Sequence, residues 1–134
     1  MTGFTAVLLY IVWTLLLALM YATYRVPIAL LGKKSINHWE RGLPSDDPAV
    51  LVRAKGAHLN CMENFPLFAA VVCVAALMGK SPVVDALAGY VLYARIGQGV
   101  AHLIGTSFVL ILIRATFFLA QVGMVLYMVW GLLH

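Results

Sequence analysis

Charged residues are scarce in this sequence: Asp, Glu, Lys and Arg make up 10% of its 134 residues, against roughly 25% in soluble domains. Hydrophobic residues reach 63%, where soluble domains have roughly 45–50%. A chain this short cannot bury so much apolar surface in water. The composition therefore predicts a single-domain membrane protein and excludes disordered and collagen-like chains.

Cysteine is nearly absent as well. Cys61 and Cys73 lie twelve residues apart on one expected helix, which separates them by roughly 18 Å along its axis. They cannot form a disulfide within that helix, and we expect both to be small buried hydrophobes. The sequence also lacks a glycine-rich phosphate loop, a zinc-ligand spacing and a nucleophile elbow, and its basic residues are dispersed. We therefore expect no metal and no nucleic-acid partner.

What the sequence does contain is four long hydrophobic stretches, at 3–24, 49–78, 83–104 and 107–133. Each has about the 20 apolar residues that a helix needs to cross a bilayer, whereas a barrel needs many short alternating strands. The predicted fold is an all-α integral membrane protein, a four-transmembrane-helix bundle. A polar loop at 25–48 and two short turns connect the spans.

The basic residues indicate the topology. Six of the nine Lys and Arg residues lie between Arg25 and Lys55. Cytoplasmic loops carry an excess of such residues, so we expect the 25–48 loop in the cytoplasm and both termini outside.

Several polar residues interrupt the last three spans, where they are costly and therefore indicate function. At about 100° per residue, those of each helix share one face: Arg53, Asn60 and Glu63 on the second, Arg95, Gln98 and His102 on the third, Arg114 and Gln121 on the fourth. Nearly all lie in the cytoplasmic half. They predict a polar pocket that opens toward the cytoplasm.

Structural interpretations of the same residues stay open. Arg53 can extend to the lipid headgroups, and Arg95 and Glu63 can form a purely structural ion pair. His58 points away from the polar stripe, as an interfacial or subunit-contact residue would. Gln121 is expected to hold two helices together.

The chemistry of this pocket suggests a ligand. Arginine binds carboxylates through paired hydrogen bonds, Glu63 can accept an ammonium group, and Asn60 can bond an amide. Glutathione has two carboxylates, an ammonium and peptide groups. A guanidinium near its sulfur would favour the thiolate, which attacks lipophilic electrophiles that arrive from the bilayer.

The run from Asn60 to Phe68, Asn-Cys-Met-Glu-Asn-Phe-Pro-Leu-Phe, with Arg53-Ala54 before it, resembles the second-helix motif of the MAPEG family, membrane-associated proteins in eicosanoid and glutathione metabolism. Tyr93-Ala94-Arg95 resembles the third-helix element of that family. The resemblance covers essentially the whole chain and is closest to bacterial-type members similar to microsomal glutathione transferases, which implies a bacterial inner membrane.

The resemblance implies a homotrimer that binds glutathione between subunits at its cytoplasmic side. It implies that Asn60, Glu63 and Arg95 bind glutathione and that Arg114 stabilises the thiolate as the catalytic residue. Together with the pocket, it gives the predicted glutathione site: Arg53, Asn60, Glu63, Arg95, Gln98 and His102. The predicted function is a detoxifying membrane glutathione transferase or peroxidase, with glutathione as co-substrate and a lipophilic molecule or lipid as the second substrate.

Some positions depart from the family pattern. Gly56 stands where the family often has an arginine, Asn64 where the leukotriene branch has tyrosine, and Phe118 where the prostaglandin branch has a tyrosine hydroxyl. Gln98 and His102 replace tyrosine or histidine residues on the third helix. These departures keep open a non-enzymatic lipid-binding or scaffold protein of the same fold.

Two other classes fit less well. A small four-span multidrug exporter needs an acidic residue on its first helix, and the span 3–24 has neither Asp nor Glu. A haem-binding bundle with His58 and His102 as axial ligands has two histidines on different helices, but no recognisable haem motif.

Overall fold

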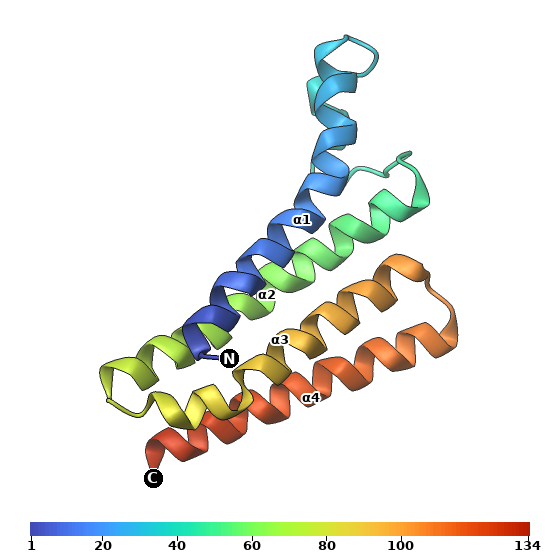
Figure 1. Cartoon of the computed structure of the whole chain (residues 1–134). Coiled ribbons are helices and arrows are strands. Elements are labelled where there is room, and N and C mark those ends of the chain that lie inside the picture. Colours follow the sequence, from blue (N-terminus) through green and yellow to red (C-terminus); the bar gives the residue numbers. More distant parts are fainter.

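The computed structural model describes all 134 residues, and its order of elements is four long helices with one short helix in the first loop. Figure 1 shows the four long helices packed lengthwise into a bundle, with both termini at the same end. The elements are α1 (Gly3–Leu30), η1 (Ile36–Trp39), α2 (Ala49–Leu77), α3 (Ser81–Ile104) and α4 (Phe108–Leu133). No strand occurs, so the predicted all-helical fold is confirmed.

Local sequence signals start and end these helices. The Thr2 and Ser107 side chains accept hydrogen bonds from the backbone of Thr5 and Leu110, which caps the starts of α1 and α4. Gly79 adopts a positive φ of 67° after α2, a conformation that favours glycine. Our prediction that the loop begins at residue 25 is wrong, because α1 continues through Pro27 to Leu30. Proline removes a single helical hydrogen bond there, and the helix passes over it.

The core is narrow. Only 24 of the 134 residues are buried, and α3 contacts all three other helices while α1 and α4 hardly meet. The outward faces carry exposed leucines such as Leu8 and Leu119. Cys61 is buried, but Cys73 is exposed on the outer face of α2, which corrects our expectation that both cysteines are buried; both are free.

Three helices, α1, α2 and α4, are long and apolar enough to cross a membrane. The remaining helix, α3, holds Arg95 and Gln98, both buried, among its 24 residues. Because its neighbours shield these side chains, α3 can be more polar than the other three.

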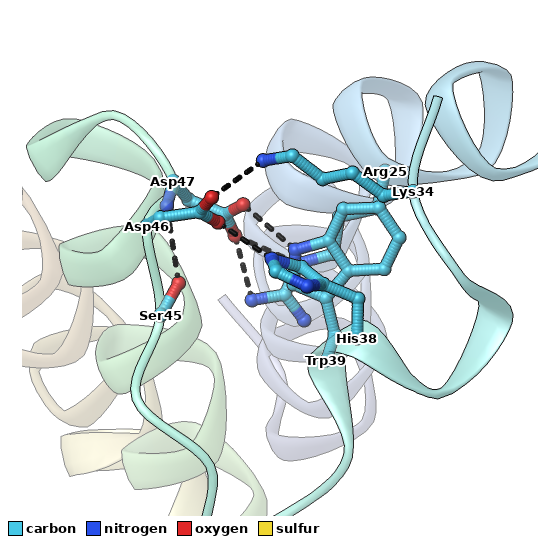
Figure 2. Close-up of polar contacts among 7 residues, drawn as sticks. All are labelled: Arg25, Lys34, His38, Trp39, Ser45, Asp46 and Asp47. Carbon is cyan, nitrogen blue, oxygen red and sulfur yellow. Dashed lines mark hydrogen bonds and ion pairs between the residues drawn. The ribbon is translucent and has the colours of Figure 1, made fainter. Parts of the chain in front are cut away.

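The loop between α1 and α2 is held by two aspartates (Figure 2). Asp47 is buried, and it accepts hydrogen bonds from the Arg25 guanidinium and the Trp39 indole nitrogen, each at 2.8 Å. Asp46 pairs with Lys34 Nζ and His38 Nε2, also at 2.8 Å. Much of the positive charge of the loop is thus paired with the two aspartates of the same loop.

We expect this loop to open in acid. Hydrogen bonds from Lys34 and His38 lower the pKa of Asp46 to about 2. Burial acts to raise the pKa of Asp47, but hydrogen bonds from Trp39 and Arg25 outweigh it and lower that pKa. A carboxyl with a lowered pKa stabilises the fold above its unfolded pKa of about 3.9 and loses this effect as the pH falls toward the folded value. Trp39 fluorescence, in a variant with Trp13 and Trp130 replaced by Phe, should shift to solvent-exposed emission between about pH 4 and 2.

The double variant Asp46→Asn, Asp47→Asn is the control for this titration. It should show exposed Trp39 emission already at pH 7 and no further change in acid. An unchanged signal down to pH 2 in the parent protein would contradict the prediction.

Candidate functional site

A groove runs between α2 and α4 and has α3 at its base. Its volume is about 560 Å³, which is within the usual range for small-molecule sites. Helical spacing places its side chains, because residues three or four apart share a face. The lining residues are Asn60, Glu63 and Asn64 from α2, Gln98 from α3, and Ile111, Arg114, Ala115 and Phe118 from α4.

The α2 side of the groove offers one carboxylate and one amide. Asn64 Nδ2 donates to the Asn60 backbone carbonyl at 2.8 Å and to Asn60 Oδ1 at 3.1 Å. These bonds orient the Asn60 side chain and leave its amide nitrogen free to donate. Glu63 is exposed and forms no ion pair with any residue of the chain.

The opposite side supplies positive charge. Arg114 Nε is buried and has no hydrogen-bond partner in the chain. Beside it, Gln98 Oε1 accepts a hydrogen bond of 3.0 Å from Gln121 Nε2, which confirms that Gln121 holds α3 and α4 together. An unpartnered buried donor is costly, so Arg114 is suited to an anionic ligand group. The groove can therefore bind a molecule that carries both an anion and an ammonium.

The groove thus brings together four of the predicted site residues, Asn60, Glu63, Gln98 and Arg114. Arg53 lies elsewhere: its Nε donates to the Leu103 carbonyl at 2.9 Å, which satisfies a backbone group in the last turn of α3.

His102 packs over Gly56, where an added Cβ would lie 2.9 Å from its Cε1 atom. The histidine therefore fills the space that a larger residue at position 56 would need.

Arg95 is also outside the groove. It is 2% exposed, and its guanidinium lies over the Tyr10 ring at 5.6 Å from the centroid. The structural alternative of an Arg95–Glu63 ion pair is not formed within the chain, whose three ion pairs all involve the loop aspartates.

His58, which we expected at the membrane interface or at a subunit contact, is bonded to the Tyr21 hydroxyl at 2.7 Å. Arg25 at the end of α1 also has a partner within the chain, because it forms an ion pair with Asp47.

Four groove residues were missed as ligand contacts: Asn64, Ile111, Ala115 and Phe118. Asn64 lies four residues after Asn60, while Ile111 and Phe118 lie three before and four after Arg114, so helical spacing alone could have placed these three on the site face. Ala115 lies four residues after Ile111. No group of three or more His, Cys, Asp or Glu side chains is arranged to hold a metal ion.

The MAPEG family model matches residues 3–134, nearly the whole chain. The chain belongs to the MAPEG family. A comparison with curated proteins found no match. As a MAPEG protein with three strongly apolar long helices it is an integral membrane protein of a family that acts in glutathione and eicosanoid metabolism. Asn60, Glu63 and Asn64, the residues that α2 presents to the groove, all belong to the MAPEG-like motif.

Proposed function

We propose that this MAPEG protein is a membrane glutathione transferase whose glutathione site is the groove between α2 and α4. The observation that carries the proposal is that one groove holds the free carboxylate of Glu63 and the half-buried Arg114, whose Nε is buried and has no partner. Glutathione has an ammonium for the first and an anionic sulfur for the second. Family membership supports the same ligand class.

The four groove residues that the sequence predicted then have defined tasks. Glu63 accepts the ammonium, while the free amide groups of Asn60 and Gln98 bond the peptide carbonyls. Arg114 stabilises the glutathione thiolate, and the proton of the thiol passes to water. The thiolate donates an electron pair to an electrophilic carbon of a lipophilic substrate, and the leaving group departs with the bonding pair. A preorganised cation that stabilises the negative charge on the reacting sulfur has a large catalytic effect.

Arg53 and His102 then act indirectly, as positioning residues. Arg53 fixes the end of α3 to α2, and His102 fills the contact above Gly56. The peroxidase variant of the proposal uses the same thiolate: a lipid hydroperoxide is reduced to its alcohol and water, and two glutathione molecules become one disulfide.

The proposal includes a homotrimer in a bacterial inner membrane, with the 25–48 loop in the cytoplasm. Glu63 is exposed on a membrane helix, and such a group needs a polar neighbour, which an adjacent subunit can supply. Six of nine basic residues at one end of the bundle support the orientation.

The alternative of a non-enzymatic lipid-binding protein has one observation in its favour. Phe118, which has no hydroxyl, occupies the groove one turn after Arg114. If the protein binds lipid but no glutathione in detergent solution, the alternative replaces the proposal.

The variant Glu63→Gln tests the site directly. It should weaken glutathione binding about 10- to 100-fold, because a charged hydrogen bond to the ammonium is lost. Calorimetry on detergent-purified protein measures this change.

Two controls make that result specific. Desamino-glutathione, which lacks the ammonium, should bind the wild type and Glu63→Gln equally, and Glu40→Gln in the loop should leave glutathione binding unchanged. Equal losses for glutathione and its desamino analogue would exclude the assigned contact.

A further inference from the structure

Arg95 is a buried cation without an acid. Its side chain is 2% exposed, its Nε has no hydrogen-bond partner, and no carboxylate of the chain lies within ion-pair distance. The Tyr10 ring lies 5.6 Å from its guanidinium, and the Cys61 thiol lies beside it. Neither is a carboxylate, and the attraction of a cation to a ring or a thiol is weaker than that to a carboxylate. A buried charge of this kind calls for an anionic partner.

Arg95 lines a second cavity, of about 150 Å³, which shares only Asn64 with the lining of the proposed glutathione groove. Most of the lining is apolar, with polar groups only at Tyr10, Asn64, Arg95 and Gln121. Leu67 on α2 and Leu126 on α4 are 64% and 63% exposed at its edge. The cavity therefore opens between α2 and α4 at an exposed apolar edge, with its charge at the inner end.

The depth of Arg95 restricts the source of the anion. It lies nine residues before the end of α3 at Ile104, about 14 Å along a helix of about 36 Å. A phospholipid phosphate stays outside the hydrocarbon core, more than about 15 Å from the midplane. A fatty acid can enter as the neutral acid and ionise beside a cation, and its chain suits the apolar edge.

We propose that this cavity binds a long-chain fatty acid, with the carboxylate on the Arg95 guanidinium and the chain passing between Leu67 and Leu126 into the bilayer. The site does not depend on glutathione: Gln98 faces the groove and Gln121 the cavity, so that the hydrogen-bonded pair stands between them.

The experiment compares palmitate labelled with ¹³C at its carboxyl with hexadecanol, on full-length protein in a non-ionic maltoside detergent. The wild type should bind palmitate at least about tenfold more tightly than the alcohol, since charge-assisted bonds to a guanidinium are strong. Arg95→Met should abolish that preference and Arg95→Lys should retain part of it. The loop variant Arg41→Met, which changes net charge equally, should behave as the wild type.

A second variant tests the cavity without touching the buried charge. Leu126→Trp places a large ring at the exposed edge, where folding is unaffected, and should weaken the binding of both palmitate and hexadecanol about tenfold. Circular dichroism and gel filtration show whether each variant keeps its helices and assembly.

Several results would overturn the proposal. These are equal wild-type affinities for acid and alcohol, a preference for the acid that survives in Arg95→Met, or no effect of Leu126→Trp. Displacement of palmitate by phosphatidylglycerol but not phosphatidylcholine would assign the site to a phospholipid instead. If palmitate bound only to Glu63→Gln and not to the wild type, the carboxylate that already occupies Arg95 would be Glu63 of another copy of the chain.

Discussion

Arg114→Met should reduce the rate constant kcat for glutathione conjugation of a reactive aryl halide about 100- to 1,000-fold, with a much smaller change in KM. The reason is that Arg114 is the cation of the groove whose Nε is buried and unpartnered. Removal of one preorganised donor from a developing or resident anion has effects of this size. Steady-state kinetics in detergent measure the loss.

The pH dependence separates thiolate stabilisation from simple binding. Without the guanidinium, the pKa of bound glutathione should return toward the ordinary thiol value of about 8.5. The Arg114→Met rate should then rise about tenfold for each pH unit between 6.5 and 8.5, while the wild-type rate stays nearly flat. Ultraviolet absorbance of the bound thiolate near neutral pH should fall in parallel.

Matched variants keep this test specific. Arg114→Lys keeps the charge and should recover part of the rate. Thr116→Val removes a polar group from an exposed position on the same helix, where the hydroxyl bonds only the Leu112 carbonyl, and should be neutral. A wild-type pH profile in Arg114→Met would show that this arginine does not act on the thiol.

Helical periodicity predicted much of the groove. The three-residue spacing of Asn60 and Glu63 placed them on one face, and the arginine of the fourth span faces them in the structure. These predictions depend only on residues within a helix and on the requirement that polar groups avoid lipid. The same reasoning predicted the Gln121 contact, which α3 supplies through Gln98.

Angular position alone does not determine the contacts of other residues. Arg53 shares a stripe with Asn60 but begins two turns earlier, about 10 Å along the axis, and bonds the nearer Leu103 carbonyl. Arg95 shares a face with Gln98, yet Tyr10 from α1 covers it. The partner in each case comes from another helix, and a single helix sequence holds no information about that distance.

Glycine positions depended on packing in the same way. From the sequence alone, Gly56 is interpreted as a position where the family arginine is missing. The structure shows that the His102 side chain from α3 fills the space beside Gly56. Only the crossing of two helices reveals that a small residue there is required for contact.

Gly99→Ala should lower the free energy of unfolding by about 1–3 kcal/mol, a typical cost of overpacking. Gly99 is buried on α3, and an added Cβ would lie 2.8 Å from Cζ2 and 3.0 Å from Nε1 of Trp13 on α1. Small residues at such crossings let membrane helices approach closely. The indole is a large ring within the bundle, so the two helices themselves must separate. Unfolding in mixed micelles of increasing dodecyl sulfate content measures the change.

Gly123→Ala is the matched control, because nothing lies within 4 Å of a Cβ added at that helical position. Alanine is favoured over glycine in helices by about 1 kcal/mol, so this change should be neutral or stabilising. Combining Gly99→Ala with Trp13→Leu should recover most of the loss caused by the alanine, relative to Trp13→Leu alone, since the clashing ring is gone. The coupling between the two positions would then exceed the error of additivity for independent sites, about 0.5 kcal/mol. Equal effects of alanine at 99 and 123 would mean that α1 and α3 do not depend on this contact.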